Sequence, residues 1–255
     1  MSTSRQNGSL YTNIQNKIAT IEFGHPASNS FPSQLLERLK NELITLGKNN
    51  DISVIILKSE GERAFCAGAS FDELMAITNL DEGKKFFSGF ANVINAMRTC
   101  GKLIIGRIQG KTVGGGVGLA AACDYVLATE SASIKLSEFT IGIGPFVIEP
   151  AVSRKIGIAA TSVLTLDATS WQNAYWAKEK GLYAKVFETK TELDKEVILL
   201  SEKLASYNQQ ALSEMKKALW KGTKSWNELL AERAAISGEL VLSNFTKNAL
   251  KKFKK

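Results

Sequence analysis

A chain of 255 residues, 44% hydrophobic and 22% charged, has the composition of an ordinary soluble globular protein and is long enough for one large domain. The formal net charge of +7 does not favour nucleic-acid binding, because the lysines cluster in the C-terminal third without interleaved stacking aromatics. No apolar stretch approaches the roughly 18 residues of a membrane span, and the N-terminus lacks a signal-peptide core, so we expect no membrane association and a cytoplasmic location.

The first part of the chain alternates strands and a helix. Residues 10–16 and 18–24 alternate apolar and polar side chains around a short turn, which predicts a hairpin. Residues 31–50 place leucines at helical spacing and end at a glycine and two asparagines, so a helix follows. Residues 52–59 are a continuous β-branched run, typical of a strand that is buried on both faces.

The middle of the chain continues this alternation. A loop with glycine, a long helix within residues 82–100 and apolar strands at 103–110 and 125–130 are expected in turn. Strands alternating with helices predict an α/β fold with a parallel or mixed sheet covered on both faces. From Pro150 onward the sequence is almost entirely helical, and its four tryptophans, Trp171 among them, are interpreted as packing anchors.

The segment GGGVGLAAACD opens a buried helix with three glycines, Gly114 to Gly116. A helix N-terminus has backbone N–H groups without intrahelical partners, and glycine allows a ligand to approach them closely. The segment lacks the pattern of a nucleotide phosphate loop or a dinucleotide fingerprint. The glycines therefore indicate either a site for another oxyanion or tight packing of the helix on the sheet, and this segment alone leaves both open.

A second turn of small residues, RAFCAGAS at 63–70, also follows a strand and opens a helix. Two such turns on neighbouring strands can aim one N–H each at a single point. A pair of converging donors would stabilise the enolate oxygen formed when chemistry occurs beside a thioester carbonyl.

Three motifs, RAFCAGASFDEL, GGGVGLAAACDYVLA and IKLSEFTIGIGP, occur in the order found in the crotonase, or enoyl-CoA hydratase/isomerase, superfamily, which the chain resembles over nearly its whole length. The resemblance implies a ββα spiral core at 1–195 and a C-terminal helical, oligomerising region at 196–255. It also implies an acyl-CoA substrate, coenzyme A entering only as part of that substrate, no metal or other cofactor, and a homotrimer or dimer of trimers. The motifs look most like the bacterial methylglutaconyl-CoA hydratase branch.

The resemblance carries roles to individual residues. The backbone N–H groups of Ala69 and Gly115 become the oxyanion donors, and Glu138 becomes the catalytic acid or base. Family hydratases commonly have a second glutamate where this chain has Gly118. Substrate contacts are expected along both glycine motifs, at Arg63, Cys66, Ala67, Gly68, Gly114 and Gly118.

The missing acid leaves the reaction open. A hydratase comes first, with an isomerase that uses Glu138 as its one proton shuttle, a decarboxylase, and a non-catalytic acyl-CoA-binding scaffold as alternatives. Glu149 is interpreted as a first-turn glutamate of a helix beginning near Pro145 rather than as a second acid. Arg63 is either a phosphate contact or a solvated arginine.

The other candidate groups are expected to have no catalytic role. Asp124 follows the glycine helix at its far end and is expected to be structural. The three cysteines show neither a disulfide framework nor metal-ligand spacing, so they are expected to be reduced, buried and inert. His25, the single histidine, is interpreted as a loop residue near the coenzyme A chain.

Overall fold

A computed structural model describes residues 7–252. Its main sheet has six strands, of which the first two form the predicted antiparallel hairpin and all later neighbours run parallel. In spatial order the strands are β1 (Ser9–Gln15), β2 (Ile18–Gly24), β3 (Val54–Ser59), β5 (Leu103–Ile108), β7 (Tyr125–Thr129) and β9 (Lys185–Phe187).

A smaller parallel sheet carries the turns of interest. It contains β4 (Ala64–Cys66), β6 (Lys111–Val113) and β8 (Ile134–Lys135) in that order. Each strand of this small sheet follows a strand of the large sheet along the chain, so the polypeptide winds as a ββα spiral. The expected spiral core is confirmed, and it brings the two glycine-bearing turns onto neighbouring strands.

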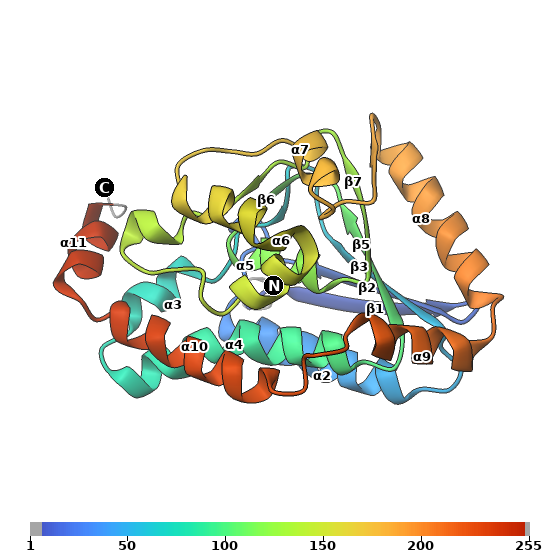
Figure 1. Ribbon diagram of the computed structural model, residues 1–255, viewed down its shortest axis with the longest axis horizontal. Coiled ribbons are helices and arrows are strands. Elements are labelled where there is room, and N and C mark those ends of the chain that lie inside the picture. The colour runs from blue at the N-terminus through green and yellow to red at the C-terminus, as the bar shows by residue number, and fades with distance from the viewer. Residues whose placement is uncertain (1–6, 253–255) are drawn as a thin grey trace.

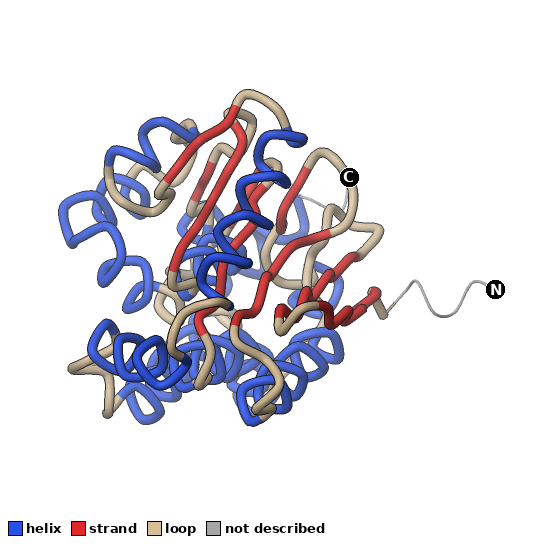
Figure 2. Tube along the Cα trace, turned by 90° about the vertical axis from the view of Figure 1, so that its right-hand side faces the viewer, coloured by secondary structure: helices blue, strands red, loops and turns tan. Residues whose placement is uncertain are grey.

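Helices cover both faces of the main sheet. On one side run α2 (Ser33–Lys48), α4 (Leu80–Thr99) and α10 (Trp226–Leu240), and on the other lies α8 (Lys190–Ala205) (Figures 1 and 2). Successive residues of β3 serve the two sides: Val54 and Ile56 pack with Leu193 and Val197 of α8, whereas the residues between them join the larger core. This double burial explains why residues 54–57 of the strand are apolar without interruption.

Seven further helical segments lie in the described part of the chain. They are α3 (Phe71–Ala76), α5 (Gly115–Ala122), the 3-10 helix η1 (Glu138–Ile141), α6 (Glu149–Leu166), α7 (Ala174–Glu179), α9 (Gln209–Leu219) and α11 (Asn244–Lys252). Helix α6 begins at Glu149, later than the expected start near Pro145, because residues 145–148 form a turn.

Helices α4 and α10 cross in direct backbone contact. A Cβ atom added to Gly83 would lie 2.7 Å from the carbonyl oxygen of Gly238, so any larger residue would force the helices apart.

The expected domain boundary after residue 195 falls inside α8, and α10, beyond it, is packed on α4 of the core. No helix in the described part of the chain is both long and apolar enough to cross a membrane.

Candidate active site

The start of helix α5 is shaped by its glycines. Gly114, the N-cap, has a φ of +53°, and a Cβ added there would lie 2.8 Å from Oε1 of Glu138. A Cβ at Gly115 would lie 2.4 Å from the Phe90 ring. The glycines thus allow the helix to pack tightly against Phe90, and they bring its first turn close to the carboxylate of Glu138.

The second turn lies beside the first. Gly68 has a φ of +91°, and a Cβ added there would lie 3.6 Å from the backbone nitrogen of Gly115. Phe31 donates its N–H to Gly68 O at 2.8 Å and accepts the N–H of Ser70 at 2.9 Å, which makes a parallel bridge to Ala69. In such a bridge the N–H of the central residue points away from its partner, so the Ala69 N–H is directed away from Phe31.

Both expected donors line one cavity. Ala69 and Gly115 belong to its wall, and within residues 7–252 neither N–H donates a backbone hydrogen bond in a turn, loop or helix cap. The arrangement can therefore present two backbone donors to one ligand oxygen, which is the geometry that stabilises a developing oxyanion.

Glu138 is the acid of this cavity. Its Oε2 is buried and has no hydrogen-bond partner among the described residues. Burial raises the pKa of Glu138 to about 7 from an ordinary value of 4.5, and backbone N–H groups of Glu138 and Ser137 partly offset this effect. The next residue, Phe139, is 42% exposed and does not contribute to this burial. A carboxyl group with a pKa near neutrality can both accept and return a proton.

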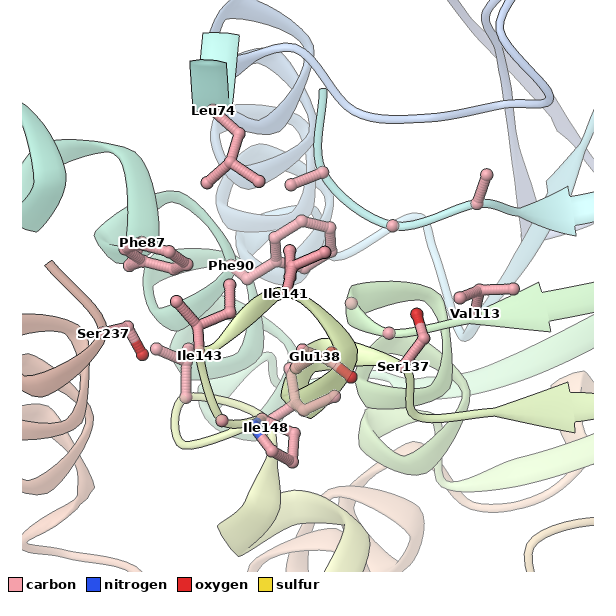
Figure 3. A pocket seen from close by; sticks show the side chains of 18 of the residues that line it. Leu74, Phe87, Phe90, Val113, Ser137, Glu138, Ile141, Ile143, Ile148 and Ser237 are labelled. Carbon is pink, nitrogen blue, oxygen red and sulfur yellow. The ribbon is translucent and has the colours of Figure 1, made fainter. Parts of the chain in front are cut away.

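The cavity has a volume of about 620 Å³ and an apolar wall. Most of its large hydrophobic side chains come from α3, α4, η1 and the segment that follows η1 (Figure 3). They are Phe71, Leu74, Phe86, Phe87, Phe90, Ile141, Ile143, Val147 and Ile148. The sequence analysis did not assign the phenylalanines to the site; their spacing along α4 signalled only a buried helix face.

The position where family hydratases commonly have a second glutamate has no room for a side chain in this structure. Gly118 is buried outside the cavity wall, and a Cβ added to it would lie 2.4 Å from Cγ2 of Ile148. Glu149 does not replace the acid, because its Oε1 accepts a hydrogen bond from Ser153 at 2.6 Å in the first turn of α6 and the residue is outside the cavity wall. Among the described residues, Glu138 is the one carboxylate that lines the cavity.

A cationic cluster lies at another part of the wall. Lys111 and Lys135 hold their ammonium groups 5.2 and 5.6 Å from the centre of the Trp171 ring. Lys135 and Trp171 line the cavity, and neither lysine forms an ion pair within residues 7–252. The interpretation of Trp171 as a packing anchor was wrong, since the ring is 42% exposed and belongs to the cavity.

The expected substrate contacts divide into two groups. Ala67, Gly68 and Gly114 line the cavity together with the expected catalytic residues. Arg63 is exposed outside the wall, and Cys66 is buried behind it. Burial raises the pKa of the Cys66 thiol to about 12, so this cysteine is a poor nucleophile.

Comparison with known proteins adds independent findings. A family model described as enoyl-CoA hydratase/isomerase matches residues 13–253. A peroxisomal Delta(3,5)-Delta(2,4)-dienoyl-CoA isomerase from Arabidopsis thaliana is 31% identical over 192 residues, covering 69% of this chain and 67% of that protein. A mitochondrial enoyl-CoA hydratase from Pongo abelii is 30% identical over 237 residues, covering 91% and 78%. The crystal structure of an enoyl-CoA hydratase from Bacillus halodurans has a TM-score of 0.88 at 22% identity, covering 95% and 99%, which shows the shared fold.

Proposed function

The chain belongs to the enoyl-CoA hydratase/isomerase family, and we propose that it shifts the double bond of an enoyl-CoA thioester, with Glu138 as its single acid–base group. The thioester oxygen would lie between the N–H groups of Ala69 and Gly115. No cofactor beyond the coenzyme A of the substrate is needed for this chemistry.

The proton transfer uses one carboxylate twice. Ionised Glu138 removes a proton from C2 of a 3-enoyl thioester, and the electron pair moves into a dienolate whose oxygen accepts both backbone N–H groups. Protonated Glu138 then returns the proton to C4, and the double bond is left between C2 and C3. The pKa of about 7 supports this cycle, because neither protonation state of Glu138 is costly near neutral pH.

One observation carries the choice of isomerisation: Ile148 fills the space beside Gly118. Hydration is easiest with a second carboxylate to orient and activate water, and the family places that acid at the position of Gly118. Here the position is apolar and closed. An apolar site with one acid favours moving a proton between carbons over adding water.

The clustered lysines support an orientation for the substrate. The two ammonium groups beside Trp171 have no ion-pair partner within residues 7–252 and attract phosphate oxygens, so the phosphates of coenzyme A would lie toward Lys111 and Lys135. The acyl chain would then extend past Glu138 between the phenylalanines of α4. Arg63, exposed outside the wall, is not needed for this arrangement.

Hydration is the second candidate, because relatives named enoyl-CoA hydratases align over nearly the whole chain. The finer possibility, methylglutaconyl-CoA, adds a second carboxylate to the substrate. Lys135 is the only lysine or arginine among the described residues lining the cavity. A second carboxylate directed between the phenylalanines would therefore be buried without a partner, which is unfavourable.

The test follows product masses in deuterated water for a 3-enoyl-CoA, crotonyl-CoA and 3-methylglutaconyl-CoA. The variant is Glu138→Gln and its matched control is Glu149→Gln, which changes an acid outside the cavity. We expect the 3-enoyl-CoA to become a 2-enoyl-CoA in the wild type and the control but not in Glu138→Gln. Hydrated product as the main outcome would make the protein a hydratase, release of carbon dioxide a decarboxylase, and binding without turnover a scaffold.

A further inference from the structure

Ser237 is a buried polar residue that the proposed reaction does not use. It lies on α10 and is 1% exposed, and its Oγ has no hydrogen-bond partner among the described residues. Serine hydroxyls inside helices often bond to the carbonyl four residues earlier, as Ser201 does to Val197 at 2.7 Å. The Ser237 hydroxyl makes no such bond, and burying an unpaired hydroxyl is costly.

Ser237 belongs to the wall of the active-site cavity. Figure 3 shows Ser237 entering from α10 on the side opposite Val113 and Ser137, with its oxygen directed toward the cavity and Phe87 and Ile143 beside it. The cationic cluster lies toward the other end, since Lys135 is paired with Val113 across β8 and β6. The Oγ atom of Ser237 is therefore an isolated polar group at the apolar end of the cavity.

We propose that Ser237 selects acyl chains that carry a neutral oxygen, a hydroxyl or carbonyl group, at the end remote from the thioester. The inference rests on the proposed acyl-CoA function and its orientation. A chain lying between Phe86, Phe87 and Phe90 reaches α10 only with its far end, where the serine hydroxyl can donate or accept one hydrogen bond. A purely apolar chain would leave that hydroxyl unpaired, and among the described residues that line the cavity the only lysine or arginine, Lys135, lies toward the other end.

The tight crossing of α4 and α10 offers a competing explanation for a small residue at this position. Residue 237 precedes Gly238, whose backbone contacts Gly83, so a bulky side chain would not fit beside the crossing. Alanine meets that steric requirement as well as serine does. The substitution Ser237→Ala therefore separates the two explanations, because it removes the hydroxyl and keeps the crossing.

The experiment measures binding, so it does not depend on turnover. The probes are saturated acyl-CoA thioesters of four, six and eight carbons, each with and without a terminal hydroxyl group, titrated calorimetrically into the wild type and Ser237→Ala. The matched control is Ser201→Ala, which removes a buried helix hydroxyl that is not part of the cavity. We expect one chain length to bind about threefold to tenfold more tightly with the hydroxyl, in the wild type and the control but not in Ser237→Ala.

The outcomes separate this inference from the proposed function. Equal binding of every matched pair to the wild type, or a preference that survives in Ser237→Ala, would overturn the role of Ser237 and leave the acyl-CoA function standing. Absence of binding by all probes would overturn both.

Discussion

The two ends of helix α5 are built in opposite ways. At its start, within residues 7–252, Gly115 has a backbone N–H without a backbone acceptor, and the nearby Glu138 has a buried oxygen without a hydrogen-bond partner. At its far end, Asp124 is fully paired: Oδ2 lies 2.9 Å from Nζ of Lys216 and accepts the N–H of Ile104 at 2.8 Å, and Oδ1 accepts Nε1 of Trp220 at 2.8 Å. One short helix thus separates a polar cluster that lacks hydrogen-bond partners from one in which the polar groups are paired.

This difference teaches where function and stability lie. A buried acid with one unpaired oxygen costs folding energy, and this cost is explained if a substrate supplies the missing contact. The Asp124 cluster ties α9 to the strand β5 and the end of α5, because Lys216 also donates to the carbonyl oxygen of Lys102 at 2.7 Å. Substitutions at the start of α5 should change activity, and substitutions at its far end should change stability.

The largest effect is expected for Glu138→Gln. The substitution keeps the shape of the side chain and removes its ability to exchange a proton, so kcat should fall about 100- to 10,000-fold. The unfolding free energy at pH 8 should stay equal or rise, because a buried carboxylate is removed. Steady-state kinetics and urea unfolding check both halves, and a variant that keeps its kcat would contradict the assignment of the acid.

Asp124→Asn should have the opposite signature. It leaves the Lys216 ammonium, 2% exposed, without its charge partner, and breaking a buried ion pair costs about 3 to 5 kcal/mol of unfolding free energy. The kcat of the folded fraction should change little. Chemical unfolding and kinetics on the same preparation measure this, and the double variant Asp124→Asn/Lys216→Met should recover part of the loss. A fall in kcat without a loss of stability would erase the distinction between the two ends.

The pH dependence of stability sharpens the comparison. Below pH 4.5 Glu138 is protonated in both states; between 4.5 and about 7 the unfolded chain has released this proton while the folded protein retains it. Raising the pH through this window therefore favours unfolding, and the unfolding free energy should fall by on the order of 3 kcal/mol before levelling off above pH 7. Subtracting the Glu138→Gln profile isolates this contribution, and a flat difference would show that the pKa of Glu138 is not raised.

Local patterns predicted the backbone of the site better than its wall. The hairpin, the buried strands and the two glycine turns follow from periodicity and glycine placement, and the resemblance located Glu138 through its motif. Three other features of the site join residues from distant elements. They are the close approach of Ile148 to Gly118, the place of Ser237 in the cavity wall, and the two lysines over the Trp171 ring. Such contacts depend on how the helices pack against the ββα core, so no pattern within one sequence segment predicts them.

Trp220→Phe tests the paired end with the smallest expected effect. The substitution removes one N–H donor from Asp124 Oδ1 and keeps an aromatic ring against Trp226, whose ring lies 5.8 Å away in an edge-to-face contact. Hydrogen bonds to charged groups contribute about 2 kcal/mol, and Lys216 and the Ile104 N–H still hold the other oxygen of Asp124, so the loss of unfolding free energy should stay below that of Asp124→Asn. Because the contact is remote from Glu138, kcat should not move. Urea unfolding with paired kinetics decides the matter: a loss as large as that of Asp124→Asn would mean that the tryptophan, rather than the ion pair, holds this end of the helix.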